Sequence, residues 1–137
     1  MFTENRRNNP EVNNFRVRNE IILLLGADSE PLMQRTLEAV GYPVLTAENW
    51  EQADDLFRSF AGAIRLLIID IATIGQSLLE IIASLRKNNP TLKVIVASKD
   101  VQALERHDIY ISGVIELLRK PVDKEQFLQV VRRIVEK

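Results

Sequence analysis

The sequence predicts an α/β fold: a doubly wound (βα)5 three-layer sandwich with a parallel five-stranded sheet and an N-terminal arm. Short runs rich in Ile, Val and Leu recur through residues 20–137, and each run is followed by a segment with apolar residues at helical spacing. Glycine, proline and asparagine separate these segments. Strands that are buried on both faces give continuous apolar runs, and parallel strands need a helical crossover. We therefore expect a parallel sheet between two layers of helices.

The first half of this region is expected to form two strand–helix pairs. The first strand covers residues 21–25, and Gly41 and Pro43 end the helix that follows it, because glycine favours C-terminal caps and proline cannot continue a helix. One face of that helix carries Leu32, Thr36, Leu37 and Val40. After a strand over 44–46, Asn49 is an N-cap with Gln52 three residues on. The second helix is expected to point Trp50, Ala53, Leu56, Phe57 and Phe60 inward.

The second half is expected to add three more pairs. Strands are predicted over 66–70, 93–97 and 114–118, with a weaker helix over 101–106. The helix before Asn88 and Asn89 has four residues on its apolar face: Leu78, Ile81, Ile82 and Leu85. Asp123 is expected to cap the last helix, whose apolar face carries Phe127, Val130, Val131 and Ile134.

Composition excludes several kinds of site. The 137 residues are the length of one domain, and the absence of cysteine excludes disulfides, thiol nucleophiles and cysteine-bound metals. A single histidine, His107, excludes His-rich metal centres. With 18 Lys and Arg against 19 Asp and Glu, the formal charge of -1 argues against bulk attraction to nucleic acid or membrane. The composition without cysteine favours a cytoplasmic location; in addition, no apolar run is long enough to span a bilayer and no signal peptide is visible.

Residues 1–19 are interpreted as a flexible or partner-bound arm outside the folded part, residues 20–137. The arm is rich in asparagine and carries four arginines: Arg6, Arg7, Arg16 and Arg18. One alternative function is therefore an adaptor that binds a partner or nucleic acid through the arm. Because neutral and acidic residues interrupt the arginines, the arm follows a phosphate backbone poorly, so binding of nucleic acid is not expected and the adaptor function ranks last among the alternatives.

Polar residues at the strand ends form the candidate site, since ligands of doubly wound sheets collect at the carboxyl ends of the strands. Asp70 ends the third predicted strand, Ser98 follows the fourth, and Lys120 follows the fifth. A carboxylate, a hydroxyl and an ammonium group suit an acceptor for a phosphoryl group. Asp70 would be the nucleophile, while Ser98 and Lys120 would contact the phosphoryl oxygens. Such chemistry usually needs Mg²⁺, which takes one or two carboxylates.

These residues, in this order, resemble the receiver domain of two-component response regulators over residues 20–137. The segment from Asp70 to Gly75 resembles the phosphoacceptor loop, although Thr73 and Ile74 depart from it. Residues 94–98 resemble the strand that ends in a signalling Ser or Thr, and residues 113–121 resemble the closing motif with Lys-Pro. The resemblance implies a flavodoxin-like sheet of order 2-1-3-4-5. It also implies a non-enzymatic signalling module whose partners are a sensor kinase or an output protein.

Two departures from the family pattern bear on activity. The acidic pair that holds Mg²⁺ directly after the first strand is replaced by Gly26 and Ala27, and Leu117 stands at the aromatic switch position. The resemblance therefore implies an atypical receiver with weak or no Mg²⁺-dependent phosphorylation, which acts by protein contact. The alternative is a working phosphoacceptor at Asp70, with Asp28 and Asp70 as metal ligands. Asp28 also fits an N-cap of the helix that begins near Pro31.

The face that the family uses for dimers and partners combines the fourth helix, fifth strand and fifth helix. Here it would draw on residues 101–106, 115–119 and 123–137. No output domain follows in the sequence, so the effector is expected on another chain, unless these residues are a fragment of a longer protein.

Overall fold

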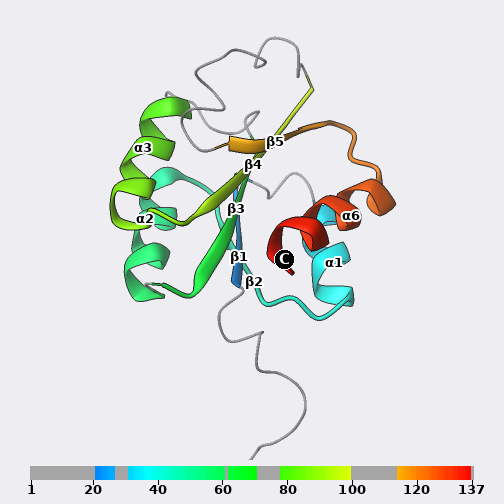
Figure 1. Cartoon of the computed structure of the whole chain (residues 1–137), viewed down its shortest axis with the longest axis horizontal. Helices are drawn as coiled ribbons and strands as arrows, with labels where there is room; N and C mark the ends of the chain where they lie inside the picture. The colour runs from blue at the N-terminus through cyan, green and yellow to red at the C-terminus, as the bar shows by residue number, and fades with distance from the viewer. Residues whose placement is uncertain (1–20, 27–30, 61, 71–77, 100–113, 137) are drawn as a thin grey trace, which may run out of the picture.

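The computed structural model describes residues 21–26, 31–60, 62–70, 78–99 and 114–136. Five parallel strands form one sheet (Figure 1): β1 (Ile21–Leu25), β2 (Val44–Ala47), β3 (Ile64–Asp70), β4 (Lys93–Ser98) and β5 (Val114–Arg119). Their order is β2-β1-β3-β4-β5, which confirms the prediction. β1, β3 and β4 each have a strand on both sides, while β2 and β5 end the sheet.

Within the described residues, four helices cover the two faces of the sheet. Figure 1 shows α2 (Trp50–Ser59) and α3 (Leu78–Asn88) on one side, and α1 (Pro31–Ala39) and α6 (Lys124–Val135) on the other. The predicted three layers are therefore confirmed. The predicted helix over 101–106 and the arm over 1–19 lie outside the described residues. None of the helices within the described ranges is long and apolar enough to cross a membrane.

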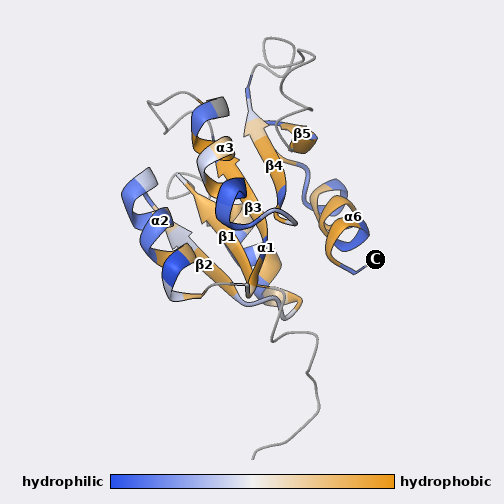
Figure 2. Cartoon of the chain, turned by 60° about the vertical axis from the view of Figure 1, so that its left-hand side comes forward, coloured by the Kyte–Doolittle hydropathy of each residue, from blue (hydrophilic) through white to orange (hydrophobic). Residues whose placement is uncertain are grey.

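The core has two halves, one on each face of the sheet, because side chains alternate along each strand. Figure 2 shows the strands as mostly apolar and the helices as polar on part of their surface. Leu24 and Ile68 pack with Leu37 of α1 and Phe127 of α6 on one face. On the other face, strand residues pack with Phe57 of α2 and with residues of α3. The continuous apolar runs in the sequence thus reflect strands that are buried on both sides.

Two helices begin at the predicted caps. The Asn49 side chain accepts a hydrogen bond from the Gln52 backbone N–H at 2.9 Å, and the Gln52 side chain accepts one from the Glu48 N–H at 2.8 Å. Asp123 accepts from the Gln126 N–H at 2.8 Å. These bonds satisfy backbone donors that a helix leaves unpaired at its start.

Three predicted core positions were wrong. Leu32 and Val40 are each 43% exposed, and Met33 is fully buried instead, beside Leu37. Val40 lies beyond the end of α1 at Ala39, so helical spacing no longer applies to it. Phe60 is 39% exposed for the same reason, because it is the C-cap residue that follows α2.

The third strand also begins earlier than predicted. β3 starts at Ile64, before the exposed Arg65, because Ile64 pairs with Ile21 of β1. The charged Arg65 interrupts the apolar run, so the sequence pattern did not indicate that the strand extends back to Ile64.

Candidate functional site

The structure brings three of the predicted site residues together at the carboxyl ends of neighbouring strands, which form one edge of the sheet, here called the site edge. Asp70 is the last residue of β3, Ser98 is the last residue of β4, and Lys120 follows β5 directly. Asp70 pairs in register with Ala97, and Ser98 pairs with Arg119. The three residues therefore occupy neighbouring rungs at the carboxyl ends of adjacent strands.

A buried ion pair is the central feature of this edge. The Lys120 Nζ lies 2.7 Å from Asp70 Oδ1, with side-chain exposures of 5% and 0%. The Lys120 backbone N–H also donates to the Ser98 carbonyl at 2.9 Å, and the Lys120–Pro121 peptide bond is cis. β3 thus supplies a carboxylate and the end of β5 supplies its cation, both removed from water.

The position directly after β1 carries no carboxylate. Gly26 is buried, its φ is 76°, and its N–H donates to the Ala47 carbonyl at 2.7 Å. A φ in this range favours glycine, because a Cβ would crowd the backbone. The chain therefore turns at Gly26, the first of the two positions at which the family carries its acidic pair.

The described residues do not fit a magnesium site by themselves. Among them, no group of three or more histidine or acidic side chains gathers in a way that would hold a metal ion. Mg²⁺ prefers octahedral oxygen ligands, and the Asp70 oxygen nearest Lys120 already accepts from an ammonium group. The predicted metal ligand Asp28 lies outside the described residues.

Leu117, the predicted switch position, lies in β5 and is partly buried. It packs against the half of the core that faces α2 and α3. An aliphatic side chain has no hydroxyl or imidazole to bond with groups at the site edge.

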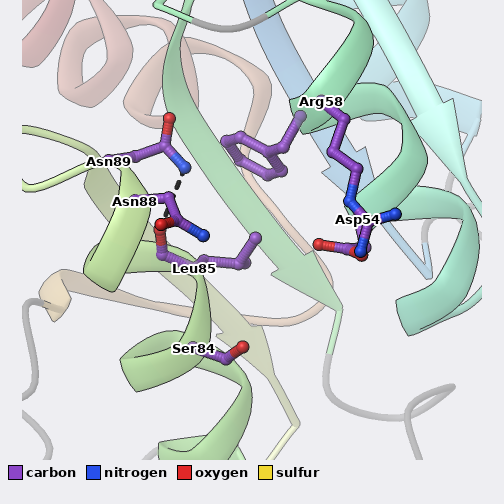
Figure 3. A pocket seen from close by; sticks show the side chains of 7 residues that line it. Asp54, Arg58, Ser84, Leu85, Asn88 and Asn89 are labelled. Atoms are coloured by element: carbon purple, nitrogen blue, oxygen red, sulfur yellow. Dashed lines mark hydrogen bonds and ion pairs between the residues drawn. The ribbon is translucent and has the colours of Figure 1, made fainter.

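One feature was missed by the sequence analysis. A hollow of about 240 Å³ lies between α2 and α3 and is lined by Asp54, Phe57, Arg58, Ser84, Leu85, Asn88 and Asn89 (Figure 3). Phe57 was predicted only as core, and Asn88 and Asn89 only as a helix stop. No local pattern signals this feature, because it arises where the ends of two separate helices meet.

One family model matches the chain, and solved structures share its fold. The model of the response regulator receiver domain matches residues 27–132. The non-phosphorylated receiver domain of HemR from Leptospira biflexa is 22% identical, with a TM-score of 0.75 over 86% of this chain and 95% of that chain. A receiver domain protein from Clostridium thermocellum is 23% identical, with a TM-score of 0.73 over 85% and 94%.

A third similar structure was solved with a partner protein. The receiver domain of Ssk1 from Saccharomyces cerevisiae, crystallised with the histidine phosphotransfer protein Ypd1, is 14% identical, with a TM-score of 0.69 over 85% of this chain and 89% of that chain. The chain matches none of the curated proteins.

Receiver domains are in general non-catalytic signalling modules that interact with kinases or phosphotransfer proteins, and they typically bind Mg²⁺ at the phosphorylation site. The family match covers most of the sequence, and the sheet order and both helix layers are those of the receiver fold. The chain therefore belongs to the family of response regulator receiver domains and is a module of signal transduction.

Proposed function

We propose that this chain is an atypical receiver that signals by contact with protein partners and is weakly, if at all, phosphorylated with Mg²⁺. It is not an enzyme. Residues 20–137 form the receiver unit and residues 1–19 an arm. The observation that carries the proposal is Gly26, which follows β1 where a metal-binding carboxylate is expected, while the neighbouring strand β3 ends in the buried Asp70–Lys120 ion pair.

Electrostatics support this reading. Phosphorylation of Asp70 brings a carboxylate and a phosphate together, and this repulsion has to be offset by cations. Lys120 supplies one cation at 2.7 Å, but Gly26 supplies no carboxylate for a metal. Lys120 alone therefore leaves the transfer slow, although it suffices to hold Asp70 in a fixed position.

Two further site residues, Ser98 and Leu117, occupy the expected positions but do not supply the groups that are missing for phosphorylation. Ser98 is 7% exposed and holds the position from which a hydroxyl would contact a phosphoryl oxygen. Leu117 stands at the switch position, so that a change at Ser98 finds no aromatic or hydrogen-bonding side chain at that position. The site is accordingly a fixed structural centre in this proposal.

Partners are proposed to bind the face formed by β5 and α6, and a homodimer through the same face belongs to this proposal. Ile115 on β5 is 41% exposed, and Glu116 bonds to Arg133 of α6 at 2.7 Å, which joins the two elements into one surface. The Ssk1 receiver domain was crystallised with a histidine phosphotransfer protein. We propose protein partners of that class, a sensor kinase, or an output protein.

Phosphorylation can be tested with a small phosphodonor. The whole chain is incubated with Mg²⁺ and acetyl phosphate, or with Mg²⁺ and beryllofluoride, and the readouts are intact mass and the fluorescence of Trp50, the only tryptophan. We expect little or no phosphoryl adduct and no fluorescence shift. Asp70→Asn is the site variant, and Asp123→Asn, an exposed cap, is the matched control.

A strong Mg²⁺-dependent adduct that is lost in Asp70→Asn and kept in Asp123→Asn would overturn the proposal. It would favour the working phosphoacceptor instead. In that case Asp28→Ala should abolish Mg²⁺ binding while the far-UV circular dichroism spectrum stays unchanged.

A further inference from the structure

The hollow between α2 and α3 has the size for a single bulky side chain. Its volume of about 240 Å³ is below the roughly 300–1,000 Å³ of pockets that hold cofactors and other small molecules. It lies between the last turns of the two helices, and Figure 3 shows side chains of both helices around it. A nucleotide or similar cofactor is therefore too large for it.

The lining of the hollow is apolar below and polar at the rim, with no net charge. Phe57 and Leu85 are 5% and 2% exposed and form the apolar part. Asp54 and Arg58 neutralise each other through an ion pair of 2.7 Å. Ser84, Asn88 and Asn89 complete the rim with neutral polar groups. An apolar group surrounded by uncharged polar groups matches this lining better than a phosphate or a metal ion.

An exposed apolar side chain of suitable size directly follows the helix that lines one side of the hollow. Phe60 follows α2 directly, two residues after Arg58, and is 39% exposed. Among the described residues, the other large exposed hydrophobics are aliphatic: Leu32, Val40 and Ile115. Phe60 also has no place in either half of the core. The same end of α2 thus carries an exposed aromatic ring and part of a hollow that fits one.

We propose that a second copy of this chain binds here, with Phe60 of each copy inserted into the hollow of the other. A group and its receptor on one surface patch form a self-complementary contact, which a two-fold axis closes into a dimer. Because the lining has no net charge, the two patches meet without like-charge repulsion. Exposed aromatic anchors typically dominate such contacts. This contact uses a different face from β5 and α6 and does not depend on Asp70.

The test is sedimentation velocity of the whole chain over a range of concentrations. Wild type is compared with Phe60→Ser and with Leu32→Ser, a matched control because Leu32 is a large hydrophobic residue on α1 that is 43% exposed and lies outside both proposed contact faces. We expect reversible dimerisation that Phe60→Ser weakens by about tenfold or more, the loss typical of an aromatic anchor. Leu32→Ser should leave the dimer unchanged.

A second variant changes the side of the hollow that α3 forms. Ser84→Trp places a ring on the exposed rim of α3 and should fill the hollow, so it should weaken the dimer as much as Phe60→Ser does. Circular dichroism confirms that each variant is folded. A wild type that stays monomeric, or a dimer that survives both variants, overturns the proposal. A third variant, Ile115→Ser, tests the other face: a dimer that survives Phe60→Ser and is lost in Ile115→Ser overturns the proposal and assigns self-association to β5 and α6.

Discussion

Breaking the Asp70–Lys120 ion pair from one side is expected to cause one of the largest single losses of stability in the domain. Lys120→Met keeps most of the side-chain stem and removes the charge, so a fully buried carboxylate loses its ammonium partner. Breaking a buried pair in this way costs about 3–5 kcal/mol. A domain of this kind unfolds with a total of roughly 5–15 kcal/mol, so the variant should lose a large share of its stability.

Arg133→Met is the matched control for this prediction. The Arg133–Glu116 pair has the same N–O distance, 2.7 Å, but its side chains are 57% and 30% exposed. Exposed pairs contribute about 0–1 kcal/mol because water solvates the separated charges well. The two ion pairs therefore have the same N–O distance and differ in how far their side chains are buried.

Urea unfolding, followed by Trp50 fluorescence and by circular dichroism, measures both effects. The midpoint of Lys120→Met should fall strongly at an unchanged m-value, and that of Arg133→Met should hardly move. The double variant Asp70→Asn, Lys120→Met should lose less than the sum of the two single losses, because neither charge is then left buried alone. Equal losses in Lys120→Met and Arg133→Met would refute the reasoning that burial decides the contribution of the pair.

Three smaller predictions concern the scaffold, and thermal and urea unfolding measure all of them. Gly41→Ala should cost about 1–2 kcal/mol, because φ is 99° and a Cβ there meets no atom within 4 Å, so backbone strain is the only penalty; no loss would contradict this. Asn49→Ala removes the cap of α2 and should cost about 1 kcal/mol, with a neutral result counting against the cap. Leu24→Ala should cost about 2–5 kcal/mol in the core, whereas the exposed Leu32→Ala should stay within about 0.5 kcal/mol; similar losses would contradict the assigned burial.

The strands and caps of this fold could be predicted because their signals are local. β1 and β4 are buried on both faces, so each appears in the sequence as an apolar run. Asn49 and Asp123 are typical N-cap residues and mark the starts of their helices. The ends of elements were harder to predict. Phe60 continues the apolar spacing of α2, but the helix stops one residue earlier, and only the backbone decides this.

That three polar residues meet at neighbouring strand ends was predictable, but the geometry of their contacts was not. Parallel strands bring their carboxyl ends to one edge, so Asp70, Ser98 and Lys120 could be grouped from the sequence alone. The 2.7 Å contact and its complete burial depend on packing from both sides of the sheet. The positive φ of Gly26 depends on its bond to Ala47 of the neighbouring strand. Long-range contacts of this kind leave no mark in a single stretch of sequence.

The position of β5 at the end of the sheet gives the two partners of the ion pair different local stabilities. Asp70 is on β3, which pairs with β1 and β4, whereas Lys120 follows a strand that pairs on one side only. Elements with fewer neighbours open at lower free energy than the centre of a sheet. Amide hydrogen exchange should therefore be faster in β5 than in β3. An opening of β5 would withdraw the ammonium group while the carboxylate stays in place, so reagents can reach Asp70 through a partial opening that leaves most of the domain folded.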